Sequence, residues 1–297
     1  MSFSVFGFDI YVYGIIIASA ILAAFVVGVL IFHFIGYKTD IAFLILLLSV
    51  PLGIVLARAY FVAFTSHQFN TFWDVINIRA GGMAIYGGII GGALGIFIAA
   101  RIMKVGFYSL ADIVVITVIL AQAIGRWGNF VNAEAYGVGV VNHVFPFTVL
   151  IDDGCCDKGY PHPHLAAFFL ESMMNLIGFF VMIFLFLDIK LRKKDEELGT
   201  TIWGVTIKKR EKHRWGTISA VYLIWYGLVR AIIEPFRTDS LLIFGSNEIV
   251  FNRVSFMLSI ALVILGVLLL LAVKFGYVSQ ENQGCLKKPP TQTKTDT

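Results

Sequence analysis

The chain has 297 residues, of which 58% are hydrophobic and 14% are charged, and its formal net charge is +4. Soluble domains carry roughly 25% charged residues, so this composition excludes an ordinary water-soluble globular protein. It indicates a membrane protein, and the modest positive charge gives no reason to expect a nucleic-acid partner.

Several apolar segments of about 20 residues are each long enough to cross a hydrocarbon core about 30 Å thick. Their hydrophobicity is continuous and does not alternate, which predicts helices and not the strands of a barrel. The expected fold is an all-α polytopic membrane protein with about seven transmembrane helices. The predicted spans are residues 14–35, 41–64, 82–103, 109–126, 165–189, 216–234 and 254–276. The segment 1–13 lacks the basic residues that open a secretory signal, so the first span is expected to remain in the protein.

The basic residues predict how this bundle is oriented. Lys and Arg are frequent after the first, third and fifth spans and in the C-terminal tail, and sparse in the alternate connections. By the positive-inside rule, the N-terminus is expected outside and the C-terminus in the cytoplasm. We expect one seven-helix domain over residues 1–276, with an outer loop 127–164 and a basic cytoplasmic loop 190–215. Residues 277–297 are polar and are predicted to be a disordered tail.

The three cysteines predict no cofactor site. Cys155 and Cys156 are adjacent in the predicted outer loop, and Cys285 lies in the tail. Adjacent cysteines rarely form a disulfide with each other because the ring is strained, and no zinc-ligand spacing is present. No metal or organic cofactor is implied by any ligand cluster in the sequence.

The fourth predicted span ends in a polar segment, Gly-Arg-Trp-Gly-Asn-Phe-Val-Asn-Ala-Glu-Ala-Tyr-Gly, over residues 125–137. It places Arg126, Asn129, Asn132 and Glu134 at the edge of the membrane. An ionisable residue there is costly unless something pairs with it, and four polar groups exceed what a helix cap needs. We therefore expect the chemistry of the protein in this segment.

The sixth predicted span ends with a second charged group, Arg230, Glu234 and Arg237. Arg230 and Glu234 are four residues apart, so they share a helix face and can form an ion pair, and Pro235 is expected to end or bend the helix. A purely structural ion pair is one interpretation. If Arg126 meets the other two arginines, one glutamate does not neutralise all three, whereas a bound anion would.

Two further polar residues lie in the second and third spans. Arg58 either snorkels or pairs with a neighbouring helix, or it belongs to the site, and the sequence leaves this open. Gly88 and Gly92, four residues apart, are expected to let helices pack closely. Tyr86 beside them either faces the space that the glycines leave or belongs to an interfacial aromatic belt.

The region before the fifth span holds groups for which the sequence favours structural roles. The cluster Pro161-His162-Pro163 is interpreted as a turn, since proline fixes turn geometry. Glu171 is expected to lie favourably at the N-terminus of the fifth span, where the helix dipole is positive.

The residue types indicate a ligand class before they indicate a reaction. Guanidinium groups match phosphate oxygens in a bidentate manner, and asparagines can bridge ester or hydroxyl oxygens. Glutamate and tyrosine are candidates for handling protons. These features predict a phospholipid-handling site that opens to the outer leaflet, and they leave open whether the protein is an enzyme or a transporter.

The motif Gly125-Arg126-x-Gly128-Asn129-Phe130-x-Asn132-x-Glu134-x-x-Gly137 resembles the signature of the bacterial prolipoprotein diacylglyceryl transferases. The resemblance covers nearly the whole chain. Further matches follow in chain order: Val12-Tyr13-Gly14, Ala57-Arg58-x-Tyr60, Gly81 to Gly88, Glu171-Ser172 with Asn175-Leu176, and Arg230-x-x-x-Glu234 with Arg237-x-Asp239-Ser240.

The resemblance implies that the diacylglyceryl group of phosphatidylglycerol is transferred to the lipobox cysteine of a prolipoprotein signal peptide. A thioether forms and glycerol-1-phosphate leaves, as the first step of bacterial lipoprotein maturation. The expected location is the bacterial cytoplasmic (inner) membrane, with the catalytic domain embedded in the lipid bilayer and its active site toward the outer leaflet. No cofactor is implied.

Site roles follow from the resemblance and from the residue types. The expected catalytic residues are Arg126, Arg230, Tyr86 and Glu134. Arg126 and Arg230 are expected to clamp the phosphate, with Asn129 and Glu134 orienting the headgroup. Glu234 is expected to hold Arg230. Substrate binding is also expected of Asn132, Gly137, Arg237, Tyr13 and Arg58.

Many family members carry histidine at the position of Tyr86. A phenol is a poor base at neutral pH. Tyr86 is therefore expected to position the headgroup or the thiol.

Two other functions are less well supported by the sequence. A phospholipid or small-anion transporter would also line a pathway with arginines, but such proteins often contain internal repeats and none is evident here. A structural membrane scaffold is disfavoured by the number of arginines without an evident partner in the sequence.

Overall fold

The computed structural model describes residues 2–5, 8–66, 69, 71–78, 81–151, 162–198, 215–237 and 254–278, with only the backbone described for residues 2, 3, 5, 8–10 and 189–198. The expectations for Cys155, Cys156 and Cys285 therefore lie outside the described residues. So do those for most of the loop 190–215 and nearly all of the tail 277–297.

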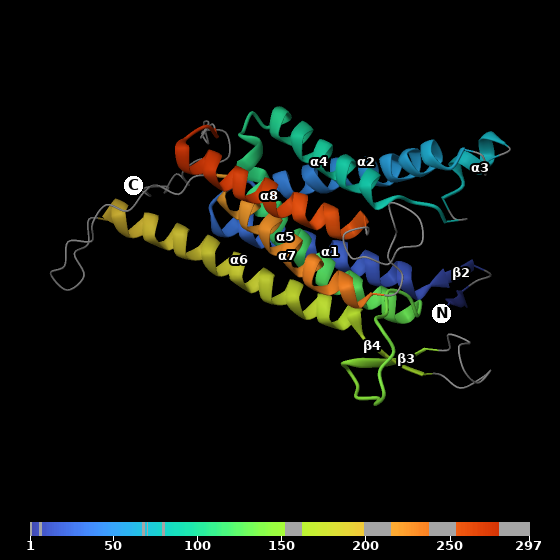
Figure 1. Ribbon diagram of the computed structural model, residues 1–297. Helices are drawn as coiled ribbons and strands as arrows, with labels where there is room; N and C mark the ends of the chain where they lie inside the picture. Colours follow the sequence, from blue (N-terminus) through green and yellow to red (C-terminus); the bar gives the residue numbers. More distant parts are fainter. Residues whose placement is uncertain are drawn as a thin grey trace, which may run out of the picture. The chain divides into compact units, whose positions relative to one another are not determined.

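Within the described residues, seven helices are long and apolar enough to cross a membrane, which confirms the predicted fold class. The protein is a multi-pass membrane protein built mostly of helices (Figure 1). The helices are α1 (Val12–Phe34), α2 (Asp40–Phe64), α4 (Ile85–Ile102), α5 (Phe107–Val131), α6 (Ala167–Leu198), α7 (Thr217–Ile233) and α8 (Val254–Phe275).

The fourth span is longer than the sequence predicted. Instead of ending at residue 126, α5 continues to Val131, so the loop expected from residue 127 begins later. Asn132 still donates its backbone N–H to the carbonyl of Gly128 over 3.1 Å. The first half of the polar motif is thus helical. Polar side chains end a helix only where the backbone N–H and C=O groups find hydrogen-bond partners outside the helix.

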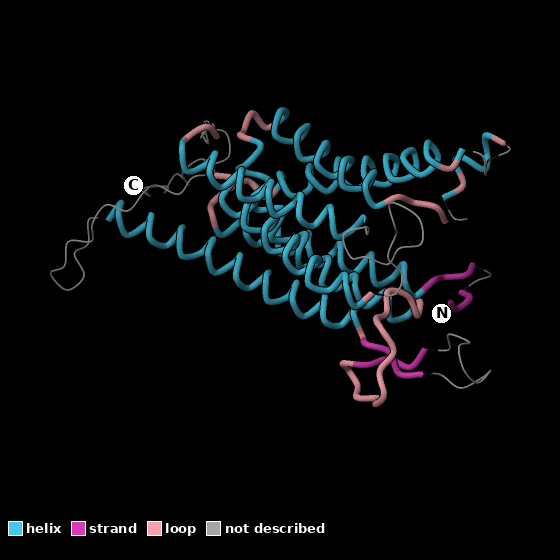
Figure 2. Tube along the Cα trace, viewed as in Figure 1, coloured by secondary structure: helices cyan, strands magenta, loops and turns pink. Residues whose placement is uncertain are grey.

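Short elements precede or connect the spans, and the strands among them were not predicted (Figure 2). They are α3 (Phe72–Ile76), the 3₁₀ helix η3 (Glu234–Phe236), and two antiparallel hairpins, β1 (Ser2–Val5) with β2 (Phe8–Tyr11) and β3 (Thr148–Ile151) with β4 (His162–Leu165). The interpretation of the Pro161 to Pro163 cluster as a turn is wrong for His162 and Pro163. Both lie in β4, where Pro163 pairs with Leu150.

The chain forms two compact units. The first contains residues 1–26 and 112–278, and the described part of the second contains residues 27–111. The chain passes from one unit to the other within α1 and within α5.

In the second unit, α2 and α4 pack through glycines, as predicted, but not through the glycines that were predicted. A Cβ atom on Gly95 would lie 2.5 Å from Ser49 Cα, and a Cβ on Gly91 would collide with the Leu52 carbonyl. A Cβ on Gly92, in contrast, would meet nothing within 4 Å. The close approach therefore uses the glycine row one residue away from Gly88 and Gly92.

In the first unit, α7 packs against α8 along one face and is bonded to α5 at its start. A Cβ on Gly227 would lie 2.7 Å from the Ser259 carbonyl of α8, so these helices touch through their backbones. At the start of α7, the buried carboxylate of Asp112 on α5 accepts the backbone N–H groups of Gly216 and Ser219, each at 2.8 Å. These contacts satisfy N–H groups that the first turn of a helix leaves without partners, and they fix α7 against α5.

Candidate active site

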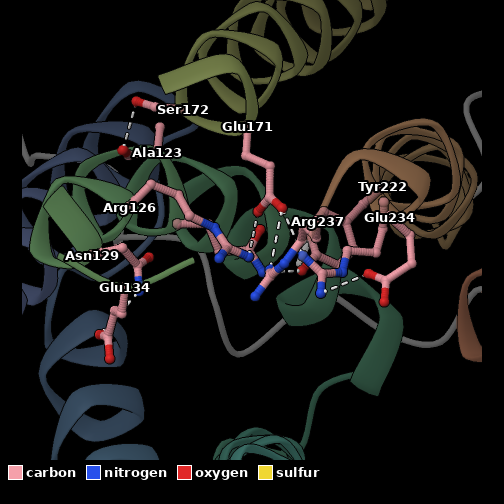
Figure 3. A network of polar contacts seen from close by, with 11 residues as sticks. Ala123, Arg126, Asn129, Glu134, Glu171, Ser172, Tyr222, Glu234 and Arg237 are labelled. Carbon is pink, nitrogen blue, oxygen red and sulfur yellow. Dashed lines mark hydrogen bonds and ion pairs between the residues drawn. The ribbon is translucent and has the colours of Figure 1, made fainter. Parts of the chain in front are cut away.

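The carboxylate of Glu171, near the start of α6, joins arginines from three segments of the first unit. Its Oε2 lies 2.5 Å from Arg126 Nη2 of α5, and its Oε1 lies 2.6 Å from Arg230 Nη1 of α7. Arg237 Nη1, just after η3, lies 3.5 Å from the same Oε1. Figure 3 shows Arg126 and Arg237 directed toward Glu171. The three arginines, whose convergence the sequence analysis raised as a condition for binding an anion, thus meet at one carboxylate.

A second carboxylate holds Arg230 from the other side. Glu234 is fully buried, and its Oε2 lies 2.9 Å from Arg230 Nη2, which confirms the predicted ion pair. Pro235 also behaves as predicted, because α7 ends at Ile233 and the 3₁₀ turn of η3 follows. This change of helix type ends α7 beside the cluster, with Arg237 immediately after the turn.

The cluster carries an excess of positive charge on its accessible side. Three guanidinium groups and two carboxylates leave a net charge of +1. The arginine side chains are 10–19% exposed, whereas those of Glu171 and Glu234 are 4% and 0% exposed. An anion approaching this group therefore meets arginines first.

Arg126 is the arginine with the most donors still available. Its side chain is the most exposed of the three, at 19%, and it pairs with Glu171 through Nη2. Within the described part of the chain, its guanidinium has no second charged partner. Since guanidinium carries five N–H donors, Arg126 can bind a phosphate oxygen while it keeps Glu171.

Sequence reasoning missed the role of Glu171, which it placed only at the start of a helix. Glu171 is 3% exposed, so it needs a positively charged partner, and the arginines expected at the same membrane face were the available ones. That argument was accessible from the sequence, whereas the sharing of one carboxylate by three arginines was not.

The three other polar residues of the motif form a separate small group. Asn129 and Asn132 each donate an Nδ2 hydrogen to Glu134 Oε1, over 3.1 and 3.3 Å. The chain turns back here through Ala133 and Ala135, at φ values of 51° and 57°, where non-glycine residues are uncommon. This turn places the Glu134 side chain beside the last turn of α5 (Figure 3).

Gly137 connects the motif to the segment after α7. It forms a β-bridge with Arg237, and its N–H donates to the Leu165 carbonyl over 2.7 Å. A Cβ at this position would lie 2.8 Å from the Phe236 carbonyl, so a larger residue does not fit. Gly137 thus helps to position Arg237, and its expected contact with substrate stays a prediction.

Tyr13, at the start of α1, lies against the motif helix. A Cβ on Gly128 would be 2.7 Å from Tyr13 Cδ2, and Tyr13 is 38% exposed. Its phenol is therefore held beside the polar segment of α5 while part of its surface stays accessible.

Arg58 and Tyr86 belong to the second unit and are described within it. Arg58 is 7% exposed and donates to the carbonyls of Val75, Gly81, Gly82 and Asp74 over 2.5–2.8 Å. This geometry favours the structural interpretation that the sequence had left open. The ring of Tyr86 lies 6.0 Å from that of Tyr60, centroid to centroid.

The described residues contain no group of three or more His, Cys, Asp or Glu side chains that could hold a metal ion. The site that they form is instead an arginine cluster, held by two buried carboxylates and suited to an anionic group such as phosphate.

Comparison with known proteins gives a family. The family model described as prolipoprotein diacylglyceryl transferase matches residues 1–272. A phosphatidylglycerol–prolipoprotein diacylglyceryl transferase of Clostridium kluyveri is 38% identical over 247 residues, which cover 82% of this chain and 86% of the relative. The enzyme of that name from Finegoldia magna is 34% identical over 284 residues, or 95% and 99% of the two chains.

A further relative of the same name, from Staphylococcus epidermidis, is 32% identical over 301 residues, which cover 99% of this chain and 96% of the relative. The family match extends over the spans that carry the arginine cluster. The chain therefore belongs to the prolipoprotein diacylglyceryl transferase family.

Proposed function

We propose that this protein transfers the diacylglyceryl group of phosphatidylglycerol to the lipobox cysteine of a prolipoprotein, with release of glycerol-1-phosphate. The names of its relatives specify the lipid donor and the prolipoprotein acceptor. One structural observation carries the proposal to particular residues, namely the convergence of Arg126 and Arg230 on Glu171.

The arginines act as the phosphate clamp. Arg126 contributes the donors that its ion pair with Glu171 leaves available. Arg230 is held in place by Glu171 and Glu234, so it needs little reorganisation when charge develops on the departing phosphate. Glu171 also offsets the repulsion between guanidinium groups that would otherwise separate them.

The reaction replaces a carbon–oxygen bond with a carbon–sulfur bond. The cysteine thiol gives up its proton, which passes to water or to the departing phosphate monoester, and the thiolate attacks the glyceryl carbon that is esterified to the phosphate. The C–S bond forms as the C–O bond breaks, and the electron pair leaves on the phosphate oxygen of glycerol-1-phosphate. The clamp stabilises that charge.

The remaining site residues orient the reactants. Asn129, Asn132 and Glu134 form the accessible polar group that contacts the headgroup. Tyr86 and Tyr13 position the headgroup or the thiol. Arg58 acts through the segment that its guanidinium holds, which ends just before α4 and Tyr86.

We also place this site toward the outer leaflet of the bacterial cytoplasmic membrane, with the N-terminus outside and the C-terminus in the cytoplasm. The distribution of Lys and Arg among the connections supports this orientation. The seven spans then act as one catalytic domain over residues 1–276.

The experiment supplies purified full-length protein with phosphatidylglycerol and a lipobox peptide, and follows peptide mass and glycerol phosphate release. The proposal predicts a diacylglyceryl mass gain on the cysteine with an equal amount of glycerol-1-phosphate. A peptide with serine in place of the cysteine is the control and stays unmodified. Movement of phospholipid or anion across vesicles without any mass gain would support a transporter instead.

A further inference from the structure

The chain that follows the polar motif of α5 lies between β4 and the segment that follows α7. On one side, the Leu165 carbonyl of β4 accepts the N–H of Gly137 over 2.7 Å, and the Leu165 N–H donates to the Val138 carbonyl over 3.0 Å. On the other side, the Val138 N–H donates to the Phe236 carbonyl over 2.9 Å. Gly137 forms its β-bridge with Arg237 on that same side. Backbone contacts thus connect β4 to the arginine that follows η3.

This connection has little room to shift. A Cβ on Gly137 would lie 2.8 Å from the Phe236 carbonyl and 3.0 Å from Leu165 Cβ. The backbone of Arg237 is extended, with φ −86° and ψ 142°. From this position its guanidinium lies 3.5 Å from Glu171 Oε1. A displacement of the backbone at Gly137 would therefore move a guanidinium group of the arginine cluster.

The carbonyl of Gly137 is bonded by a side chain, that of His164 in β4. The imidazole Nδ1 lies 3.0 Å from this carbonyl oxygen, and because a carbonyl only accepts, Nδ1 carries the hydrogen. Gly137 is buried, so removal of the imidazole would leave its carbonyl without this donor in a place where water does not readily replace it. His164 therefore holds the chain at the glycine that bridges to Arg237.

The imidazole is itself fixed in position. His164 is 6% exposed, and its ring makes an edge contact with the Tyr136 ring, with the two centroids 5.0 Å apart. Its backbone pairs with Val149 of β3 on one side and forms a β-bridge with Gly139 on the other. These contacts already restrict the ring, so its bond to Gly137 costs little further conformational entropy.

We propose that His164 is a positioning residue for the transfer reaction, because it fixes Gly137 and thereby holds Arg237 in the arginine cluster. This inference rests on the proposed function, in which the cluster binds the phosphate of the lipid donor. Arg237 follows the last turn of η3, where the hydrogen bonds of a helix no longer fix the backbone. The neighbouring segment therefore decides where the Arg237 side chain begins, and His164 acts through that segment and not on the reacting atoms.

The test measures the single-turnover rate of diacylglyceryl transfer from phosphatidylglycerol to a lipobox peptide by the purified full-length protein. His164→Leu removes the donor to the Gly137 carbonyl and is expected to lower this rate about tenfold. His164→Asn is expected to keep the rate within about threefold of wild type, because the Nδ2 donor of asparagine stands as many bonds from the backbone as the imidazole Nδ1. His143→Leu is the matched control between α5 and α6, since His143 is exposed and its Nδ1 lies 3.0 Å from Thr148 Oγ1. It is expected to leave the rate within about twofold of wild type.

A double-mutant comparison separates positioning of Arg237 from general damage to the fold. Arg237→Gln removes the guanidinium that His164 is proposed to position. In that background, His164→Leu is expected to lower the rate less than about threefold, because two residues that act through one contact are not additive. A loss of about tenfold in both backgrounds would overturn the proposal, since His164 would then act independently of Arg237.

Two further results would also overturn the proposal, namely a His164→Leu protein at the wild-type rate and a His164→Asn protein as slow as His164→Leu. If His164→Leu does not fold in detergent, His164→Gln takes its place, because its Nε2 donor stands one bond further from the backbone than the imidazole Nδ1. Absence of transfer by the wild-type protein would instead count against the proposed function, so the two failures are distinguishable.

Discussion

At the scale of single residues, the site depends on one carboxylate that three arginines share. Glu171 is 3% exposed and lies 2.5–3.5 Å from guanidinium nitrogens of α5, α7 and the segment after η3. A buried carboxylate is stable only when paired, and here its partners are also the groups that are proposed to bind phosphate. The same ion pairs therefore stabilise the fold and position the groups that are proposed to bind phosphate.

Replacing Glu171 with glutamine is expected to destabilise the protein. The substitution keeps the shape but leaves partly buried arginines without their shared counter-charge. Loss of one partner of a buried ion pair costs roughly 3–5 kcal/mol, and the partial exposure of the arginines reduces this to about 2 kcal/mol. We expect the apparent unfolding temperature in detergent micelles to fall by about 5 °C.

Glu134→Gln is the control for this measurement, because Glu134 is exposed and bonds only to asparagines in the described part of the chain. It is expected to shift the unfolding temperature by less than about 1 °C. Equal shifts for the two variants would show that Glu171 has no special role in holding the cluster.

At the scale of elements, the sequence predicted the spans better than the faces through which they pack. Apolar runs of about 20 residues identify helices because the bilayer fixes their length. The glycine segment of α4 contains two rows with a spacing of four, so the pattern alone does not say which row faces α2. The hairpins were missed for a related reason, since strands of four residues are too short to show a reliable alternation.

The two glycine rows make a matched pair of variants. Gly91→Ala places a methyl group against the Leu52 carbonyl, whereas Gly92→Ala places one where nothing lies within 4 Å. Overpacking of this kind costs typically about 1–3 kcal/mol, so Gly91→Ala is expected to lower the apparent unfolding temperature by several degrees. Gly92→Ala leaves it unchanged or slightly raised, since alanine is the better helix former. A larger loss for Gly92→Ala, measured by the same thermal unfolding, would contradict the assigned packing face.

At the scale of the whole molecule, residues far apart in the chain meet because α5, α6 and α7 begin or end at one place. The sequence placed Arg126, Arg230 and Arg237 at the ends of apolar spans on the same predicted side, and it raised their convergence as a condition for binding an anion. It did not predict Glu171 as their common partner or the β-bridge of Gly137 with Arg237, since both depend on how the helices pack. Arg58 shows the opposite case, as the resemblance implied a substrate-binding residue and its four carbonyl partners favour a structural role.

Arg126 is proposed to hold the phosphate of the lipid donor during group transfer, and the single-turnover transfer rate measures this contribution. Purified wild-type protein, Arg126→Ala and the control Arg101→Ala, whose guanidinium lies over the Phe97 ring, are compared with phosphatidylglycerol and a lipobox peptide. Removal of one preorganised donor typically costs about 10²–10³ in rate, so we expect Arg126→Ala to fall at least about a hundredfold and Arg101→Ala to stay within about threefold of wild type. A folded Arg126→Ala protein that transfers at the rate of the control would show that Arg126 does not hold the phosphate.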